Sequence, residues 1–268
     1  MAMPCMEKPR PRRLPPTLKP LPEPERADDP IAGDVVRIYE DNRREYGAPK
    51  MKRSLAREGI VASRRRIKRI MNQKGLVSAY TCKKCKPCAA KTDEAEAPNV
   101  LDREFDGHPP HTRIVSDPSY VRVGGKWNYV CLLVDLCNHE IVGRAASGRK
   151  DSRLVKAAFA TLGFPLTDID VFHADRGSEF ANSDIDDLLE AFGIRRSLSR
   201  KGNPYDNAVI ESTNRILKKE LVYRRAFADL GQLRRELNSY VRWHNEERMH
   251  STLGYMSPVE FGNAGLSL

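Results

Sequence analysis

Two stretches in the second half of the chain decide the fold: V-F-H-A-D-R-G-S-E-F at residues 171–180 and S-R-K-G-N-P-Y-D-N-A-V-I-E-S-T-N-R-I-L-K-K-E at residues 199–220. In the first, a short apolar run leads to Asp175, as expected of a buried strand that ends in an acid. In the second, Glu211 lies inside an amphipathic run that predicts a helix. Thirty-five residues separate these two acids, so they meet only if the fold brings strand and helix together.

A third acid, Asp117, lies in R-I-V-S-D-P-S-Y-V-R-V at residues 113–123, which alternates like a β-strand. Carboxylate oxygens suit the hard cations Mg²⁺ and Mn²⁺. Two such ions about 3.5–4 Å apart can stabilise both the attacking and the leaving oxygen of a phosphodiester displacement. We therefore hypothesise that Asp117, Asp175 and Glu211 hold two divalent ions. Taken alone, Asp117 would be an ordinary strand acid.

The residues around these acids predict a mixed α/β sheet flanked by helices. Three strands form an antiparallel meander, and strands then alternate with helices, which indicates one mixed sheet. The predicted strands are 113–123, 127–136, 139–147, 170–174 and 194–198, and the predicted helices are 152–162, 182–191, 207–223 and 230–244.

Residues 31–77 predict three short helices, of which the last is strongly basic. Apolar positions mark a first helix ending near Tyr46, a second closed by Gly59, and a third that Ser63 caps and Gly75 ends. A short helical module of this kind is typical of a helix-turn-helix unit whose final helix enters a major groove of DNA. The alternative is a small bundle with a solvated charged face. The candidate DNA-contacting residues of the third helix are Arg64, Arg65, Arg66, Lys68 and Arg69.

The positive charge of the chain is confined to its first part. The formal net charge is +10; residues 1–100 hold 23 Lys and Arg against 13 Asp and Glu, whereas residues 101–268 hold 23 of each. This distribution predicts an anionic partner at the N-terminal part, with a solvated basic arm as the alternative. We predict a disordered, proline-rich basic tail at 1–30, the helical module at 31–77, a linker at 78–108, the catalytic core at 109–262 and a tail at 263–268.

The cysteines and the hydropathy restrict the class of protein. C-K-K-C-K-P-C at 82–88 has metal-like spacing, but Cys82, Cys85 and Cys88 lack the second ligand pair of a closed zinc site, so structural zinc is disfavoured. Cys131 and Cys137 are predicted to be buried in a reducing cytosol. No run of 18 apolar residues and no secretory signal are present, which predicts a cytoplasmic protein that does not span a membrane.

Several motifs in the same order resemble the integrase-core transposases of bacterial insertion sequences. The resemblance is to the third family, whose transposase is encoded in two overlapping frames, and this chain is similar to its downstream-frame (OrfB-type) product. It extends over roughly residues 31–261. The motifs are D-P-S-Y-V (117–121), V-D-L-C-N-H-E-I-V-G-R-A (134–145), F-H-A-D-R-G-S-E-F (172–180), S-R-K-G-N-P-Y-D-N-A-V-I-E-S (199–212) and W-H-N-E-E-R-M-H-S-T-L-G-Y-M-S-P (243–258).

This resemblance implies a ribonuclease-H-like fold, shared with retroviral integrases, in which Asp117, Asp175 and Glu211 bind two Mg²⁺ ions that Mn²⁺ can replace. It implies DNA strand cleavage by water and transfer of the freed 3′-hydroxyl to another phosphodiester. The implied partners are the transposon ends, the target DNA and the upstream-frame product, which supplies another helix-turn-helix and a dimerising segment. A homo-oligomer on DNA, in the nucleoid of a bacterial cytoplasm, is expected.

Other polar residues are predicted to lie near the acids. If Glu211 is helical, Arg215 and Lys218 share its face and would meet DNA phosphates, with a Glu–Arg surface pair as the alternative. Arg176 and Lys201 lie on loops near the acids and are also candidate DNA contacts. His173 is either a group supporting the metal ligands or a packed strand residue. Asn207 is a further candidate supporting group.

One residue departs from the resembling family. Pro118 follows Asp117 directly, and proline removes a backbone N–H from an expected internal strand, so a local bulge is expected there. Two other functions are compatible with parts of the sequence: a catalytically impaired relative that only binds DNA, and a simple ribonuclease-H-like nuclease. All three acids are present, which argues against the first. The basic helical module and the long C-terminal motif disfavour the second.

Overall fold

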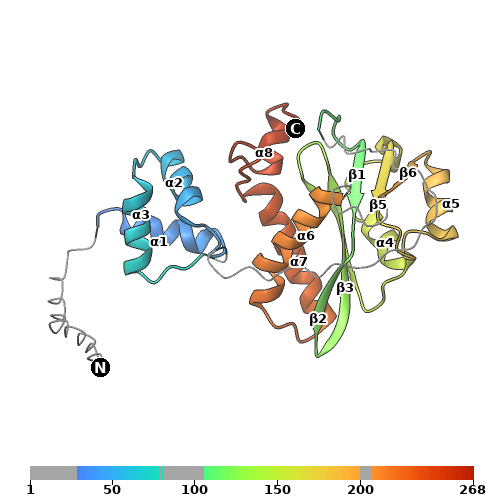
Figure 1. The fold of residues 1–268 in the computed structure, drawn as a ribbon, viewed down its shortest axis with the longest axis horizontal. Helices are drawn as coiled ribbons and strands as arrows, with labels where there is room; N and C mark the ends of the chain where they lie inside the picture. The colour runs from blue at the N-terminus through green and yellow to red at the C-terminus, as the bar shows by residue number, and fades with distance from the viewer. Residues whose placement is uncertain (1–28, 79, 81–105, 200–206) are drawn as a thin grey trace, which may run out of the picture.

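The computed structural model describes residues 29–78, 80, 106–199 and 207–268. The predicted disordered tail up to residue 28, most of the predicted linker with its Cys82–Cys85–Cys88 motif, and Lys201 lie outside these residues. Figure 1 shows the three-helix module at one end of the molecule and the β-sheet at the other, with α6, α7 and α8 between them.

The basic N-terminal module contains the three predicted helices, α1 (Ala32–Asp41), α2 (Ala48–Arg57) and α3 (Arg64–Gln73). The predicted cap of α3 is confirmed, since Ser63 Oγ accepts a hydrogen bond from the Arg66 N–H at 3.2 Å. Gly75, at φ +67°, ends this helix as predicted. The first helix was predicted to reach Tyr46, which is wrong: it ends at Asp41. The reason is a turn in which Arg43 and Arg44 both adopt positive φ angles.

The core contains one mixed six-stranded sheet, which confirms the predicted fold class. β3 lies between β4 and the β1–β2 segment, and β1 continues the sheet through β5 to β6. The β3 pairings are antiparallel, whereas β1–β5 and β5–β6 are parallel. This order is that of a ribonuclease-H-like fold. The strands are β1 (Arg113–Ser116), β2 (Ser119–Val123), β3 (Lys126–Asp135), β4 (Ile141–Ser147), β5 (Val171–Ala174) and β6 (Arg195–Leu198).

The prediction of a single strand at 113–123 is wrong in one respect, because Asp117 and Pro118 divide this segment into β1 and β2. Both strands pair with β3. Ser116 lies opposite Leu133, and Ser119 lies opposite Val130. An advance of three residues from β1 to β2 therefore matches an advance of three residues along β3. No residue is inserted, and the expected bulge is absent here. Pro118 therefore interrupts the ladder without displacing the strand that carries Asp117.

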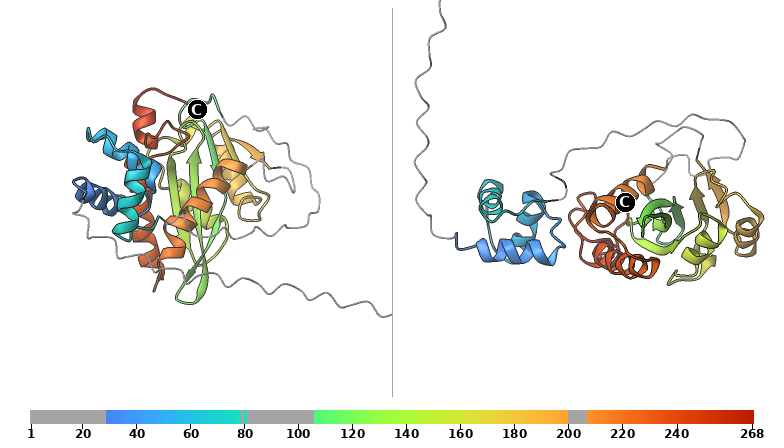
Figure 2. Two further views of the ribbon diagram at one scale, coloured as in Figure 1. Left: turned by 60° about the vertical axis from the view of Figure 1, so that its left-hand side comes forward. Right: turned by 90° about the horizontal axis from the view of Figure 1, so that it is seen from below.

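Helices cover both faces of this sheet, because alternate residues of the strands point to opposite sides. Val115 belongs to the cluster that packs under α6 (Ala208–Glu220) and α7 (Leu230–Glu246), while its neighbour Ile114 belongs to the cluster under α4 (Ser152–Phe159) and α5 (Ser183–Ala191). Figure 2 shows these two helical layers on either side of the strands. At Gly143, a Cβ would lie 2.9 Å from the Ala158 carbonyl oxygen, so glycine permits the close approach of α4 to β4.

Three short helices complete the described fold: the 3-10 helices η2 (Leu166–Asp168) and η4 (Val222–Arg224), and α8 (Pro258–Asn263). Cys131 and Cys137 are buried, as predicted. Among the residues described, no helix combines the length and the apolar composition needed to cross a bilayer.

The helical module packs against the C-terminal part of the core through polar contacts. Arg57 on α2 donates to Glu260 on α8 at 3.0 and 3.1 Å. The Met249 N–H donates to the Tyr46 hydroxyl at 2.9 Å. Tyr80, which follows the module, hydrogen-bonds Glu220 at the end of α6. The module is therefore attached to the helix that carries Glu211.

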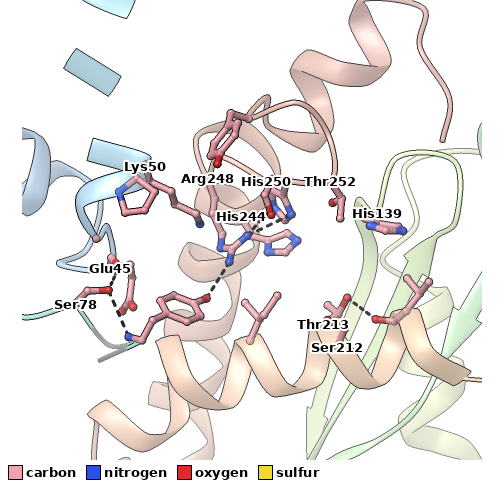
Figure 3. Close-up of a pocket in the computed structure, with 17 residues that line it drawn as sticks. Glu45, Lys50, Ser78, His139, Ser212, Thr213, His244, Arg248, His250 and Thr252 are labelled. Carbon is pink, nitrogen blue, oxygen red and sulfur yellow. Dashed lines mark hydrogen bonds between the residues drawn. The ribbon is translucent and has the colours of Figure 1, made fainter. Parts of the chain in front are cut away.

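A buried ion pair lies at this junction. Arg248 donates to both carboxylate oxygens of Glu220 at 2.9–3.1 Å, and the two side chains are 4% and 0% exposed. The Tyr240 hydroxyl also donates to Glu220, at 2.9 Å. Beside the pair lies a cavity of about 470 Å³ (Figure 3), whose lining includes His244. The pair joins α6, α7 and the C-terminal segment.

Candidate active site

The parallel pairing of β1 with β5 brings two of the predicted acids together. Ser116 lies opposite Ala174 at the ends of these strands, so the residues that follow, Asp117 and Asp175, leave the sheet side by side. Burial raises the pKa of the Asp117 carboxyl to about 6, and the neighbouring Asp175 charge contributes to the increase. Two carboxylates are therefore held close enough to repel each other.

Helix α6 is attached directly above these acids. The Asn214 side-chain amide donates to the Asp117 backbone carbonyl at 2.9 Å and to Asp117 Oδ2 at 3.2 Å. Asn214 is only 4% exposed, and its own carbonyl oxygen has no hydrogen-bond partner among the described residues. Sequence reasoning missed this residue, although its spacing of three from Glu211 on one helix could have indicated it.

Glu211 lies in the first turn of α6, one turn before Asn214. Residues three apart share a helix face, so Glu211 projects from the side of α6 that carries Asn214. Glu211 is exposed, and within the described residues no three His, Cys, Asp or Glu side chains are close enough to hold a metal ion. The structure thus brings Asp117 and Asp175 together and places Glu211 on the adjoining helix, but outside their immediate group.

A buried acid beside the pair was also missed. Glu179 is 1% exposed, and Lys150 Nζ lies 2.7 Å from its Oε1 atom. The Gly177 N–H donates to Asp175 at 3.0 Å, and a Cβ on Gly177 would come within 2.4 Å of the Glu179 carboxylate. Glycine at this position therefore leaves room for the Glu179 carboxylate beside Asp175. Lys150 lies just before α4, and nothing in its local sequence indicates a role.

Comparison with known proteins decides the family. Residues 26–84 match the model of an HTH-like domain, and residues 107–204 and 192–258 match two models of an integrase core domain. The putative transposase InsK of insertion sequence element IS150 from Escherichia coli K12 is 30% identical over 250 residues, which cover 92% of this chain and 87% of that protein. The chain belongs to the integrase-core transposases of bacterial insertion sequences.

Further relatives of this transposase are similar over comparable lengths. The transposase for insertion sequence element IS904 from Lactococcus lactis is 28% identical, with 86% of this chain and 92% of that protein covered. Among solved structures, the HTLV-2 integrase catalytic core domain in complex with magnesium overlays with a TM-score of 0.44 at 15% identity, covering 57% of this chain and 96% of that one. As a family member, the transposase is a DNA strand-transferring enzyme of the DDE type that uses divalent metal.

The carboxylates of the transposase fit a divalent cation on their own chemistry. Asp117 and Asp175 present oxygen ligands, which hard cations prefer. Burial and mutual repulsion raise the pKa of Asp117, and a cation between the two acids would relieve that repulsion. The buried Asn214 carbonyl oxygen, without a partner in the described residues, is one more oxygen beside this site.

The two predicted supporting residues have different positions in the transposase. His173 on β5 is buried, and its Nδ1 atom lies 2.8 Å from Ser197 Oγ on β6. This contact crosses the β5–β6 pair and favours the packed-strand interpretation. Asn207 is buried at the position preceding α6. Its side-chain oxygen has no hydrogen-bond partner in the part of the chain that the structure describes.

The predicted DNA contacts on α3 fall into two groups. Arg64, Arg65 and Lys68 are exposed. By contrast, Arg66 donates to the Asp29 carboxylate at 2.5–3.1 Å, and Arg69 donates to it at 3.0 Å. Asp29 precedes α1, so the chain leading into the module already neutralises part of the basic helix.

The remaining cations lie nearer the acids. Arg176 Nε donates to the Ser199 carbonyl at 3.1 Å, which holds the Arg176 side chain against the end of β6. Arg215 is exposed, and its charge opposes the increase in the pKa of the Glu211 carboxyl caused by partial burial. Burial raises the pKa of Asp117, and the charge of Lys218, two turns along α6 from Glu211, opposes part of that increase. Positive charge therefore lines α6 above the acids.

Proposed function

We propose that Asp117, Asp175 and Glu211 together bind two Mg²⁺ ions, or Mn²⁺ in their place, for cleavage and strand transfer at the ends of an insertion sequence. The observation that supports this most is the parallel β1–β5 pairing. It places Asp117 beside Asp175 under α6, the helix that carries Glu211. Carboxylate oxygens are suitable ligands for two such ions, which would stabilise the attacking and leaving oxygens of the phosphodiester.

In this proposal Glu211 completes the site when DNA and metal are bound. Glu211 is exposed in the first turn of α6, so its side chain is able to change rotamer without repacking the core. Asn214, one turn further on, keeps the helix attached to Asp117 during that change. The movement required is therefore that of one side chain and the helix end that bears it.

The chain's own residues position the reacting strand. Bound metal would supply Lewis-acid stabilisation of the attacking and leaving oxygens. Asn214 fixes the orientation of Asp117, and the Gly177 N–H fixes that of Asp175. Lys218 and Arg215 on α6 would contact phosphates of the DNA end, because they lie on the helix above the acids. These contacts hold a phosphodiester over the carboxylates.

The helical module would bind DNA through α3. Arg64, Arg65 and Lys68 are its exposed cations, and a helix of this charge suits a major groove. We further infer a homo-oligomer on DNA and cooperation with the upstream-frame product, because two transposon ends must be brought together. Cleavage and strand transfer would take place on bacterial DNA in the cytoplasm.

The test is strand transfer of a pre-cleaved, labelled DNA end with Mg²⁺. Glu211→Gln should abolish the product while retention of the DNA is unchanged. Glu190→Gln, an exposed acid on α5, is the matched control and should give wild-type product. Equal product from Glu211→Gln would refute the assignment. DNA retention by wild type without product would instead indicate a protein that only binds DNA.

A further inference from the structure

A groove of about 650 Å³ lies along the open edge of β2. The edge is open because β5 pairs with β1 but not with β2, and the last paired residues of β1 and β5 are Ser116 and Ala174. Beyond that point β2 has β3 on one side, and on the other side the described residues give it a single bridge, from Val123 to Phe227. The β2–β3 hairpin consequently extends past β5 (Figure 1), and η4 forms the opposite wall of the groove.

The groove contains the most exposed aromatic side chains of the described residues. Tyr223 is 75% exposed, Trp127 60% and Tyr120 51%, and these are the three most exposed Phe, Tyr or Trp residues in the described chain. All three line the groove. The rings of Tyr120 and Trp127 lie edge to face, with centroids 6.3 Å apart. Aromatic faces left in water at one place indicate a binding surface.

The charges in the groove are positive. The Arg122 guanidinium lies 5.7 Å from the Trp127 ring centroid, and Lys218 lines the wall formed by α6. Neither cation forms an ion pair with a carboxylate in the described residues, and no described acidic side chain lines the groove. Aromatic faces interleaved with unneutralised cations are complementary to bases and phosphates.

Two lysines connect the groove with the acids of the active site. Tyr120 is three residues after Asp117, and Lys150 Nζ lies 6.0 Å from the Tyr120 ring centroid. Lys150 also interacts electrostatically with Asp175, and Lys218 does so with Asp117. The same two lysines thus adjoin both the carboxylates and the aromatic surface. A strand whose phosphodiester lies at the acids would continue into the groove.

We propose that this groove binds an unpaired stretch of DNA next to the reacting phosphodiester. Its bases stack on Trp127, Tyr120 and Tyr223, and its phosphates contact Arg122 and Lys218. The strand must be unpaired because a base in a duplex has no face available to a side chain. The inference rests on the proposed function only in identifying the strand as the one that reaches the acids.

Tryptophan fluorescence provides the first test. The chain has two tryptophans, and Trp243 is 4% exposed, so Trp127 is the one that solvent and DNA reach. The full-length protein in EDTA is titrated with an oligothymidylate, with an abasic strand of the same length, and with a duplex. We expect the oligothymidylate to quench the tryptophan fluorescence and the abasic strand and the duplex to leave it unchanged. The quenching should be lost in Trp127→Phe. Equal quenching by the abasic strand or the duplex overturns the proposal.

The same titration tests another occupant of the open β2 edge. An extended peptide could add to such an edge by main-chain hydrogen bonds. An acidic decapeptide is therefore titrated in parallel. Quenching by the peptide and not by the oligothymidylate would assign the groove to a protein partner and overturn the proposal.

Affinity for the oligothymidylate, measured by anisotropy, provides the second test. Tyr223→Ala should weaken binding by about 5- to 150-fold, the effect of losing one base–aromatic stack. Tyr223→Phe keeps the ring and should bind like wild type. Phe192→Ala removes an aromatic residue that is 41% exposed outside the groove, and it should also bind like wild type. Equal weakening by Phe192→Ala, or none by Tyr223→Ala, overturns the proposal; circular dichroism confirms that each variant is folded.

Failure of this inference is distinguishable from failure of the proposed function. The binding tests contain no metal and require no catalysis. Strand transfer with no fluorescence quenching would refute the groove and leave the active-site assignment intact. Quenching that depends on Trp127, without strand transfer, would support the groove and refute that assignment.

Discussion

Asn214 and Asp117 are joined by two hydrogen bonds from one amide group, at 2.9 Å to the backbone carbonyl and 3.2 Å to the carboxylate. The contact joins residues 97 positions apart in the chain. It sets the distance between α6 and the end of β1. Because Glu211 is on the same face of α6, this amide also determines where Glu211 lies relative to Asp117 and Asp175.

Asn214→Ala should lower strand-transfer activity by about 10- to 100-fold, the usual effect of removing a group that orients a metal ligand. Affinity for duplex DNA should not change, because Asn214 is buried. Single-turnover strand transfer and a filter-binding assay measure the two quantities. Asn238→Ala, an exposed asparagine on α7, is the control. Full activity in Asn214→Ala would show that the amide has no part in positioning Asp117.

Asp29→Asn should strengthen DNA binding by the helical module. Arg66 lowers the pKa of Asp29 to about 2 by hydrogen bonding, so Asp29 is ionised and neutralises Arg66 and Arg69 at physiological pH. Removing its charge makes both arginines available to phosphates. The plot of log affinity against log salt concentration should steepen by about 1–2 units. Asp34→Asn changes an acid on α1 that lies 3.5 Å from Arg37 and should leave the slope unchanged; an identical slope in Asp29→Asn would contradict this role.

Breaking the buried ion pair should destabilise the protein strongly. Arg248→Met leaves Glu220 charged and buried without its partner, which typically costs about 3–5 kcal/mol. Glu220→Gln combined with Arg248→Met removes both charges and should cost less than the sum of the single changes. Arg242→Met disrupts a pair whose side chains are 75% and 50% exposed and should cost less than about 1 kcal/mol. Urea unfolding is measured for the wild type, Arg248→Met, Glu220→Gln, the double variant and Arg242→Met. Similar losses for Arg248→Met and Arg242→Met would argue against a structural role of the junction.

Glu45 should make stability depend on pH. Burial and the Glu220 charge raise the pKa of Glu45 from 4.5 to about 7, against the opposing charge of Arg224. The folded state then holds the proton more tightly than the unfolded state, so this group's contribution to stability falls as pH rises from about 4.5 to 7. Relative to Glu45→Gln, the wild-type free energy of unfolding should fall by up to about 3 kcal/mol over that range. Parallel pH curves for the two proteins would exclude this effect.

Local sequence signals predicted much of this fold, because they act over a few residues. Glycines at positive φ end helices at Gly59, Gly75 and Gly193. Side chains cap α3 and α5, where Asn182 accepts from the Ile185 N–H at 3.1 Å. The early end of α1 was not predictable, since Arg43 and Arg44 are not residues that favour positive φ. The division of the 113–123 strand was signalled by Pro118, but its undisturbed register depends on β3.

The candidate site was predictable only in part, for the same physical reason. Motif resemblance selected Asp117, Asp175 and Glu211, and strand pairing brings the first two together. Lys150 and Glu179 act through tertiary contacts that no local pattern encodes. Asp29 reduces the charge of α3 through a contact between residues 37 positions apart. Charge counted along the sequence therefore overestimates the charge that α3 presents to DNA.

The most direct measurement is a crystal structure of the protein with a DNA end and Mn²⁺, with the ions located by anomalous scattering. The account predicts two peaks between the strand acids, each within coordination distance of carboxylate oxygens, with Glu211 turned inward from α6 to complete the set. Two peaks that Asp117 and Asp175 bind while Glu211 remains in solvent, or no peak between these acids, would contradict it.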